Sequence, residues 1–182
     1  MKHLFWVAIL FCLFSSCEKM DLDADTDDNS SIEHITPISI GNGTQLSPYS
    51  VSDVLNGTIP DHKSYWFIGY AVGSTYSSIN NALFEAETSY KTNILLSDDP
   101  NCENVSTCIP IELNTSSIQK ALSLYYQREH FRQCVMVQGR TGDYFRVKGL
   151  RSVEAGYWLP DLDLSTLERT TPTEWQEWNI TY

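Results

Sequence analysis

The sequence predicts an all-β domain with one or two short helices, spanning residues 37–155. Three observations lead to this class. The longest apolar and aromatic run outside the N-terminus, SYWFIGYAVG at residues 64–73, has the composition of a strand. Four shorter apolar segments follow it, bounded by turn-forming residues. Only residues 115–126 combine a capping residue with a helical spacing of apolar side chains over more than one turn.

Residues 64–73 are predicted to form the central strand of the domain. It is an unbroken apolar and aromatic run, which is typical of a strand with both faces covered or of one that curls through a small barrel. Gly69 in its middle permits a bulge or a sharp bend. We therefore expect this segment to be the first template with which the weaker strands pair.

The remaining strands are shorter. They are expected at residues 93–97, 108–113, 133–139 and 144–153. Pro110 lacks a backbone N–H, so it confines its strand to a sheet edge or to a non-bonded side. A turn at residues 141–143, Thr-Gly-Asp, is expected to join the last two strands.

Two helices are predicted. In residues 115–126, Ile118, Leu122 and Tyr125 share one face, and Thr115 or Ser116 can cap the N-terminus. Residues 50–55 can form one turn, capped by Ser50 or Ser52, with Gly57 just beyond its end. The polar segment 74–89 is expected to be a long loop.

The predicted order is strand, strand, strand, helix, strand, strand, which is the layout of the OB-fold, a five-stranded and partly open barrel. The segments GNGTQLSPYSVSDVL, YWFIGYAVGS, NILLSDDP, CIPIEL and VMVQGRTGDYFRVKGLRSV resemble the OB-fold domain family of secreted and lipid-anchored Bacteroidetes proteins. That family is similar to the OB domain preceding some secreted nucleases. The resemblance covers residues 40–155 and implies an OB-fold-like domain with a binding role. It brings no catalytic residue.

The N-terminus has the build of a signal peptide. Lys2 precedes an apolar run that is shorter than the roughly 20 residues of a membrane span. The run ends in Leu-Phe-Ser-Ser before Cys17, which resembles a bacterial lipobox. The sequence thus predicts a lipoprotein signal peptide at residues 1–16 and lipidation of Cys17, which would anchor the protein to a membrane without spanning it. An ordinary signal peptide followed by an incidental cysteine is the alternative.

The segment 17–36 is expected to be an acidic flexible tether. It holds seven acidic residues against Lys19 and almost no large apolar residues, so it cannot bury enough surface to order itself. Acidic residues after a lipidated cysteine also resemble the surface-export signal of Bacteroidetes lipoproteins; a plain solvated spacer is the alternative. We expect an outer-membrane lipoprotein, exposed at the surface or facing the periplasm.

The net charge of −11 is concentrated in the extensions. The tether and the C-terminal segment 161–182 carry most of it, whereas residues 37–160 hold nine basic and eleven acidic residues. The balance of the whole chain argues against tight binding driven by phosphate groups.

The sequence shows no pattern of catalytic or metal-binding residues. It has no HExxH, no phosphate-binding glycine loop and no CxxC pair with nearby histidines. We therefore expect a protein that is not an enzyme and that uses no metal or cofactor. In the oxidising cell envelope Cys102 and Cys108 can form a disulfide across a short loop; a Cys108–Cys134 pair is the alternative, and Cys134 otherwise reads as a buried apolar side chain.

A ligand is expected at one mouth of the barrel, where the loops 74–89 and 140–144 converge. The candidate ligand-binding residues are Tyr76, Arg140, Tyr144, Arg146 and Lys148. A glycan would stack on aromatic side chains, here Tyr76, Tyr90, Tyr144 and Trp158. A single-stranded nucleic acid would use Arg140, Arg146 and Lys148 together with Tyr144.

Two further interpretations stay open. The basic residues between 128 and 151 can be solvated strand edges that deter edge pairing, and the domain can be a structural partner in a surface complex. A glycan or protein ligand is favoured over nucleic acid. The C-terminal extension, residues 156–182, contains Trp158, Trp175 and Trp178. These side chains either pack against the domain or form a second ligand platform.

Overall fold

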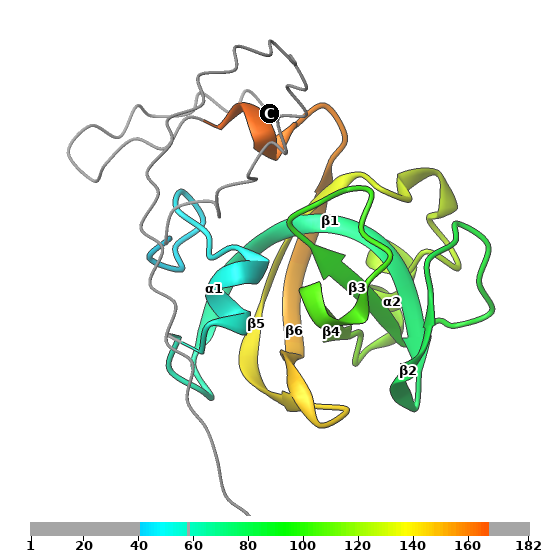
Figure 1. Ribbon diagram of the computed structural model, residues 1–182, viewed down its shortest axis with the longest axis horizontal. Coiled ribbons are helices and arrows are strands. Elements are labelled where there is room, and N and C mark those ends of the chain that lie inside the picture. The colour runs from blue at the N-terminus through cyan, green and yellow to red at the C-terminus, as the bar shows by residue number, and fades with distance from the viewer. Residues whose placement is uncertain (1–40, 58, 168–182) are drawn as a thin grey trace, which may run out of the picture. The chain divides into compact units, whose positions relative to one another are not determined.

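The computed structural model describes residues 41–57 and 59–167 of the 182-residue chain. This part is mostly β-structure with a few short helices, which confirms the predicted all-β class (Figure 1). The strands are β1 (Ser64–Tyr76), β2 (Ser78–Leu83), β3 (Asn93–Ser97), β4 (Cys108–Glu112), β5 (Cys134–Tyr144) and β6 (Val147–Leu159). The helices are α1 (Val51–Leu55), α2 (Ser116–Leu122) and the 3-10 turns η1 (Val105–Thr107), η2 (Arg128–His130) and η3 (Leu164–Thr166).

Five of these strands form a sheet that closes in a ring. β1 pairs with β3, β3 with β4, β6 with β5, and β5 with β1, all antiparallel. The parallel pairing of β4 with β6 completes the ring through Ile111 and Leu150. β2 pairs with the last residues of β1, from Ser74 to Tyr76, so the described residues hold one strand more than the five predicted.

β1 is the strand around which the others are arranged, and it arches over them in Figure 1. One edge pairs with β5 from Ser64 to Tyr70, and the other pairs with β3 from Tyr70 to Gly73. The register with β3 shifts between Ala71 and Gly73, so the irregularity lies between these two residues and not at the predicted Gly69. A Cβ on Gly73 would lie 2.3 Å from the carbonyl oxygen of Leu83, which only glycine allows.

Two apolar clusters cover the two faces of the sheet. Alternate residues of β1 belong to each: Phe67 and Ala71 lie in the first cluster, whereas Ile68, Tyr70 and Val72 lie in the second. The first cluster includes residues of α1 and α2, and the second includes Ile79, Cys102 and Leu164 from segments outside the ring. The prediction that residues 64–73 are covered on both faces is confirmed.

The short helix α1 forms where the sequence predicts it, because its N-terminal amides are capped. The Ser50 side chain accepts a hydrogen bond from Asp53 N, and the Asp53 carboxylate accepts one from Ser50 N at 2.8 Å. Asp98, which follows β3, accepts from the amides of Val51 and Ser52. Five residues make too short a helix to persist alone, so these caps attach α1 to the sheet.

The segment 74–89 is not the long loop that its polar composition suggests. β1 continues to Tyr76, turns at Ser77 (φ 53°) and returns as β2. The Asn81 side chain donates to Tyr76 O at 2.8 Å and closes this hairpin. Polar strands are missed when composition alone is used, because pairing with a neighbour decides their conformation.

The turn between the last two strands is also misplaced by the prediction. Residues 140–144 belong to β5, where Gly142 pairs with Gly149 of β6. The turn lies at Phe145 and Arg146, both with positive φ. β6 continues to Leu159, so residues 156–159 are part of the sheet.

The structure also bears on two smaller expectations, the length of the second helix and the position of Pro110. Thr115 caps α2 as predicted, but the helix ends at Leu122 instead of Tyr126. Of the two positions predicted for the Pro110 strand, only the sheet edge is excluded, because β4 has a neighbour on each side in β3 and β6. Gly149 lies beside Pro110 at this junction: a Cβ on it would meet Pro110 O at 2.5 Å.

The described residues contain no helix of the length and apolar character needed to cross a bilayer. The predicted signal peptide, Cys17, the tether and the tryptophans Trp175 and Trp178 lie outside the described residues.

Candidate functional site

Two tyrosines stack on each other beside a shallow pocket at the end of β1. The ring centroids of Tyr76 and Tyr90 are 5.6 Å apart with an angle of 25° between the planes. The Tyr76 side chain is 57% exposed. The pocket has a volume of about 280 Å³ and is lined by Tyr76, Ser89, Tyr90, Lys91 and Thr92. Tyr76 and Tyr90, both singled out in the sequence, are thus brought together.

The segment that carries Tyr90 is fixed to the sheet by side-chain hydroxyls. The Ser74 hydroxyl, buried in β1, donates to the Thr88 hydroxyl at 2.6 Å. The same Thr88 oxygen accepts from Tyr90 N at 3.0 Å. A buried hydrogen bond at the base of the segment orders the residues that follow it, so Tyr90 is presented opposite Tyr76.

Lys91 links this pocket to a second pair of tyrosines. Its ammonium lies 4.3 Å from the ring centroid of Tyr125 and 5.8 Å from that of Tyr126. Tyr125 and Tyr126 contact each other edge to face, with centroids 4.8 Å apart, and both are exposed. We call the group Tyr76, Tyr90, Lys91, Tyr125 and Tyr126 the tyrosine platform.

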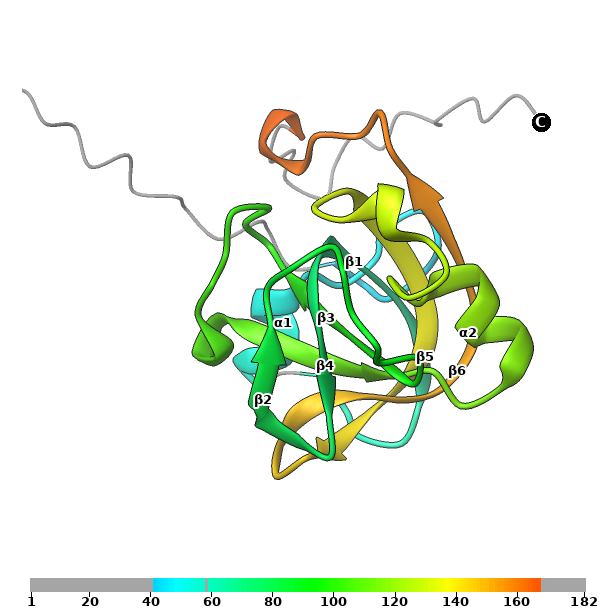
Figure 2. The same ribbon diagram turned by 90° about the vertical axis from the view of Figure 1, so that its right-hand side faces the viewer.

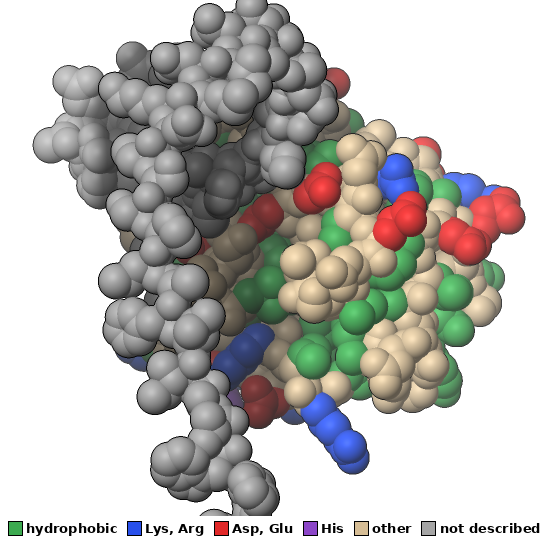
Figure 3. Space-filling view, viewed as in Figure 1, with side chains coloured by type: hydrophobic (Ala, Val, Ile, Leu, Met, Phe, Trp, Pro, Cys, Tyr) green, Lys and Arg blue, Asp and Glu red, His purple; other side chains and the backbone are tan. Residues whose placement is uncertain are grey.

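The tyrosine platform comes from three separate segments: the end of β1, the segment before β3 and the segment after α2. In Figures 1 and 2 these segments lie on the side of the molecule that turns toward the viewer in Figure 2. On the face seen in Figure 3, hydrophobic and uncharged side chains occupy the middle, and most charged side chains lie toward the rim.

Sequence reasoning missed three members of the platform. Tyr125 was assigned to the apolar face of a helix that in fact ends before it, and Tyr126 and Lys91 were not singled out. The signal was available in the Tyr-Tyr dipeptide, because two adjacent aromatics in a short helix cannot both face the core.

The Tyr144 side chain, predicted to stack on a ligand, has partners within the domain for both its hydroxyl and its ring. Its hydroxyl donates to the side-chain oxygen of Asn93, and the Asn93 amide donates to Thr75 O at 3.2 Å. Burial and then the negative charge of Glu112 raise the pKa of Tyr144 to about 12, with Arg151 opposing them. Phe145 stacks on the Tyr144 ring at 4.1 Å. Asn93 thus connects Thr75 with Tyr144, which belong to the two segments, 74–89 and 140–144, that were expected to converge.

The basic residues singled out in the sequence are mostly paired with carboxylates. Arg140 lies 3.7 Å from Glu154, and Lys148 lies 3.1 Å from Asp61. Arg146 makes no ion pair with any described residue and lies in the β5–β6 turn. Among the described residues, no hydrogen bond, ion pair or ring contact joins Arg140, Arg146 or Lys148 to the tyrosine platform, and none joins Arg140 to Tyr144.

The same pairing extends to the other arginines between 128 and 151. The pairs are Arg128–Glu87, Arg132–Glu103 and Arg151–Glu112. These ion pairs reduce the positive charge that the phosphate groups of a nucleic acid would meet. Residues 128–151 therefore do not form a groove lined by unpaired basic side chains.

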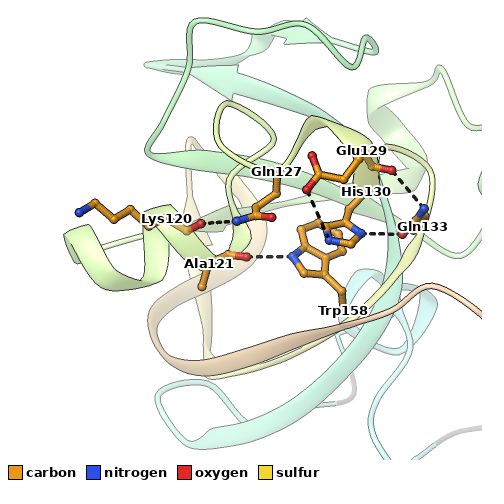
Figure 4. A network of polar contacts seen from close by, with 7 residues as sticks. All are labelled: Lys120, Ala121, Gln127, Glu129, His130, Gln133 and Trp158. Atoms are coloured by element: carbon orange, nitrogen blue, oxygen red, sulfur yellow. Dashed lines mark hydrogen bonds and ion pairs between the residues drawn. The ribbon is translucent and has the colours of Figure 1, made fainter.

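The Trp158 side chain makes a stacking contact and a hydrogen bond within the domain, as Figure 4 shows. Its ring stacks on His130 with centroids 4.6 Å apart, and its N–H donates to Ala121 O at 2.8 Å. His130 is in turn hydrogen-bonded to Gln133 at 2.6 Å. This network ties β6 to the end of α2 and to η2, and it holds the half-buried Trp158 ring in place.

Cys102 and Cys108 lie together as the sequence suggests, with the sulfur atoms 3.4 Å apart and both thiols free. Both side chains are buried, and Cys134 is buried and free as well. Residues 41–57 and 59–167 contain no group of three or more His, Cys, Asp or Glu side chains arranged to hold a metal ion.

Comparisons with known proteins give one match. A family model described as a domain of unknown function (DUF6359) matches residues 49–159, which include α1, the six strands and the tyrosine platform. Searches of the curated proteins and of the solved structures give no match.

Proposed function

The chain belongs to the DUF6359 family, and we propose that its domain is a non-catalytic glycan-binding module with an OB-fold-like barrel, held at the outer membrane by a lipid on Cys17. The observation that carries the binding role is the stacked pair formed by the exposed Tyr76 and the half-buried Tyr90 beside a pocket. A tyrosine offers a flat apolar ring together with a hydroxyl, which suits a sugar that has both an apolar face and polar edges.

The strand pairing supports the OB-fold proposal. The ring order β1-β3-β4-β6-β5 with α2 between β4 and β5 is that expected of a five-stranded Greek-key barrel. In such barrels the connection between the first and second strands contributes to the binding face. Here that connection contains β2 and the segment that carries Tyr90 and Lys91.

The pairing of basic side chains favours a glycan over a single-stranded nucleic acid. A nucleic-acid groove needs several unpaired cations along the backbone path together with stacking aromatics. Arg140, Lys148 and Arg151 each have a carboxylate within 4 Å. Residues 41–57 and 59–167 thus show aromatic stacking but not the row of unpaired basic side chains that would accompany it in a nucleic-acid groove.

Binding is tested with a glycan array followed by titration calorimetry on the best ligand. We expect the Tyr76→Ala, Tyr90→Ala double variant to lose about tenfold or more in affinity, the size expected when central aromatic contacts are truncated. Leu46→Ala removes another exposed apolar side chain and serves as the control.

Other outcomes would overturn the proposal. If single-stranded oligonucleotides bind and their affinity falls steeply with salt, the module binds nucleic acid. If neither glycans nor oligonucleotides bind to the folded domain, a structural role in a surface complex replaces the binding role.

The lipid anchor is supported by the sequence around Cys17. Cells that express the wild-type protein should incorporate a labelled fatty acid into it and retain it in the membrane fraction. Cys17→Ala should abolish the label and release the protein from the membrane. Unchanged membrane retention of the unlabelled variant would contradict the anchor.

A further inference from the structure

We propose that the glycan bound at the tyrosine platform is acidic, and that Lys91 contacts its carboxylate or sulfate group; this rests on the proposed glycan-binding function. Lys91 lines the pocket beside Tyr90 and also contacts the second tyrosine pair. It is the one charged residue among the residues that line the pocket.

The position of the Lys91 ammonium is set by aromatic contacts. At 4.3 Å from the Tyr125 centroid it lies over the negative face of that ring, which attracts a cation. The ammonium also lies over the Tyr126 ring, 5.8 Å from its centroid. An ammonium has three N–H donors, so contact with the rings leaves donors for a ligand.

The charge of Lys91 is not neutralised within the described part of the chain. Most of the basic side chains between residues 128 and 151 have a carboxylate within 4 Å, but Lys91 has none among the described residues. The nearby acid Glu87 is paired with Arg128 at 3.1 Å. A ligand anion would therefore meet a cation that has no competing partner.

The other pocket residues can bind the rest of a sugar. The Thr92 hydroxyl accepts from the Asn93 amide at 2.9 Å, so its own hydrogen remains for a ligand oxygen. Ser89 contributes a second exposed hydroxyl. The volume of about 280 Å³ lies just below the usual range for ligand pockets, which suits one sugar unit with its neighbours outside.

The negative charge of the chain does not prevent this contact. It is concentrated in the extensions, and charges in solution are screened beyond about 8 Å at physiological ionic strength. A single charged contact should also make binding far less dependent on salt than binding to a strand of phosphates.

The test compares matched polymers: polygalacturonate, its methyl-esterified form, sulfated galactan and neutral galactan. The full chain is titrated with each of them. We expect polygalacturonate or sulfated galactan to bind about tenfold more tightly than its uncharged counterpart, and whichever binds identifies the acidic group as carboxylate or sulfate.

Three variants assign the preference to Lys91. Lys91→Met keeps an unbranched apolar stem but removes the charge, and it should reduce the affinity for the acidic polymer to that for the uncharged one. Lys91→Arg should retain the preference. Lys120→Met removes an exposed lysine outside the platform and should change nothing.

Failure of this inference can be told apart from failure of the proposed function. If charged and uncharged polymers bind equally, or Lys91→Met binds the acidic polymer like the wild type, the acidic-ligand inference is wrong. Binding that is still lost in the Tyr76→Ala, Tyr90→Ala variant would then leave the glycan-binding function in place. Absence of binding to all four polymers would overturn the acidic-ligand inference, and absence of binding on the wider array would overturn the function as well.

Discussion

The two neighbouring cysteines differ in how easily they ionise. Burial opposes ionisation of Cys102, but hydrogen bonds from Ser97, Thr107, Cys108 and the backbone at Asn104 outweigh it and lower its pKa. Burial raises the pKa of Cys108 far above its usual value. Cys102 therefore ionises more readily than Cys108, and thiolates are the nucleophiles of disulfide exchange.

We predict that oxidised glutathione converts Cys102 and Cys108 to a disulfide. The Cys102 thiolate attacks one glutathione sulfur and releases glutathione, and Cys108 then displaces the second glutathione; the two protein thiols lose two electrons and two protons in all. Peptide mass spectrometry should find the linked pair. The closed loop should stabilise the fold by about 2 kcal/mol in the chain-entropy model.

Two variants check this assignment. Cys108→Ser should stop at a mixed disulfide on Cys102, whereas Cys134→Ser should still form the bridge. A Cys108–Cys134 bridge in the oxidised wild type would contradict the assignment. Burial raises the pKa of Cys134 to about 12, so this thiol should stay reduced.

Tyr70 joins the C-terminal end of the described chain to β1 through its hydroxyl. The hydroxyl donates to the Asp163 carboxylate at 3.0 Å and accepts from Leu164 N at 2.7 Å. Burial raises the pKa of Tyr70 to about 12 from a usual value of 10.0, and the amide of Leu164 opposes the shift. Asp163, with hydrogen bonds from Ser165 and Tyr70, has a lowered pKa and remains an acceptor.

We predict that Tyr70→Phe lowers the free energy of unfolding by about 1–3 kcal/mol near neutral pH, because the buried amide of Leu164 loses its acceptor. Since the folded state holds the Tyr70 proton more tightly, the contribution from the pKa shift is complete below pH 10.0 and is lost as the pH rises toward 12. Urea unfolding at several pH values should show the difference from wild type shrinking in that window. A difference that is constant in this range would contradict the role of ionisation; Tyr65→Phe is the control.

At the scale of elements, the β5–β6 hairpin has an unfavourable turn. Phe145 and Arg146 have φ values of 55° and 66°, which two-residue hairpin turns require but which Asn and Gly usually supply. Phe145 packs against the second apolar cluster. Pairing of β5 with β6 over the whole hairpin, together with this packing, offsets the backbone strain.

We predict that Arg146→Gly stabilises the protein by about 1 kcal/mol, because glycine adopts a positive φ without a steric cost. Arg146 has no ion pair with a described residue that would be lost. Thermal and urea unfolding measure the effect. Glycan binding should be unchanged, since Arg146 lies outside the tyrosine platform; reduced stability would show that the turn has another conformation.

At the scale of the whole molecule, the ring depends on a narrow junction. β4 and β6 share one paired position, Ile111 with Leu150, whereas β5 and β6 pair along their length. Gly149 makes this approach possible, since any larger residue would meet Pro110. Gly142, its partner across the hairpin, has open space where a Cβ would be.

We predict that Gly149→Ala destabilises the protein by about 1–3 kcal/mol, the usual cost of an added methyl group in a packed site. Gly142→Ala is the matched control and should lie within about 1 kcal/mol of the wild type or be slightly more stable. Urea unfolding compares them. Equal stability of the two variants would mean that the junction between β4 and β6 does not limit the stability of the ring.

How far the sequence predicts the fold depends on how local each feature is. Residues 64–73 and 93–97 are apolar enough to be recognised as strands, and Ser50 is a cap beside the residues it caps. By contrast, Thr141-Gly142-Asp143 has turn composition but is strand, since its pairing with β6 outweighs local preference. β2 was missed for the same reason.

The sequence by itself determined the all-β class, the strand β1 with both faces buried and the two helix caps, because these depend on residues close together in the chain. Only the tertiary structure decided the tyrosine platform. Tyr76, Lys91 and Tyr125 are far apart in sequence, and β-pairing over long separations brings their segments together. It also decided which cations are available to a ligand, since the carboxylate partners of Arg140 and Lys148 come from distant segments.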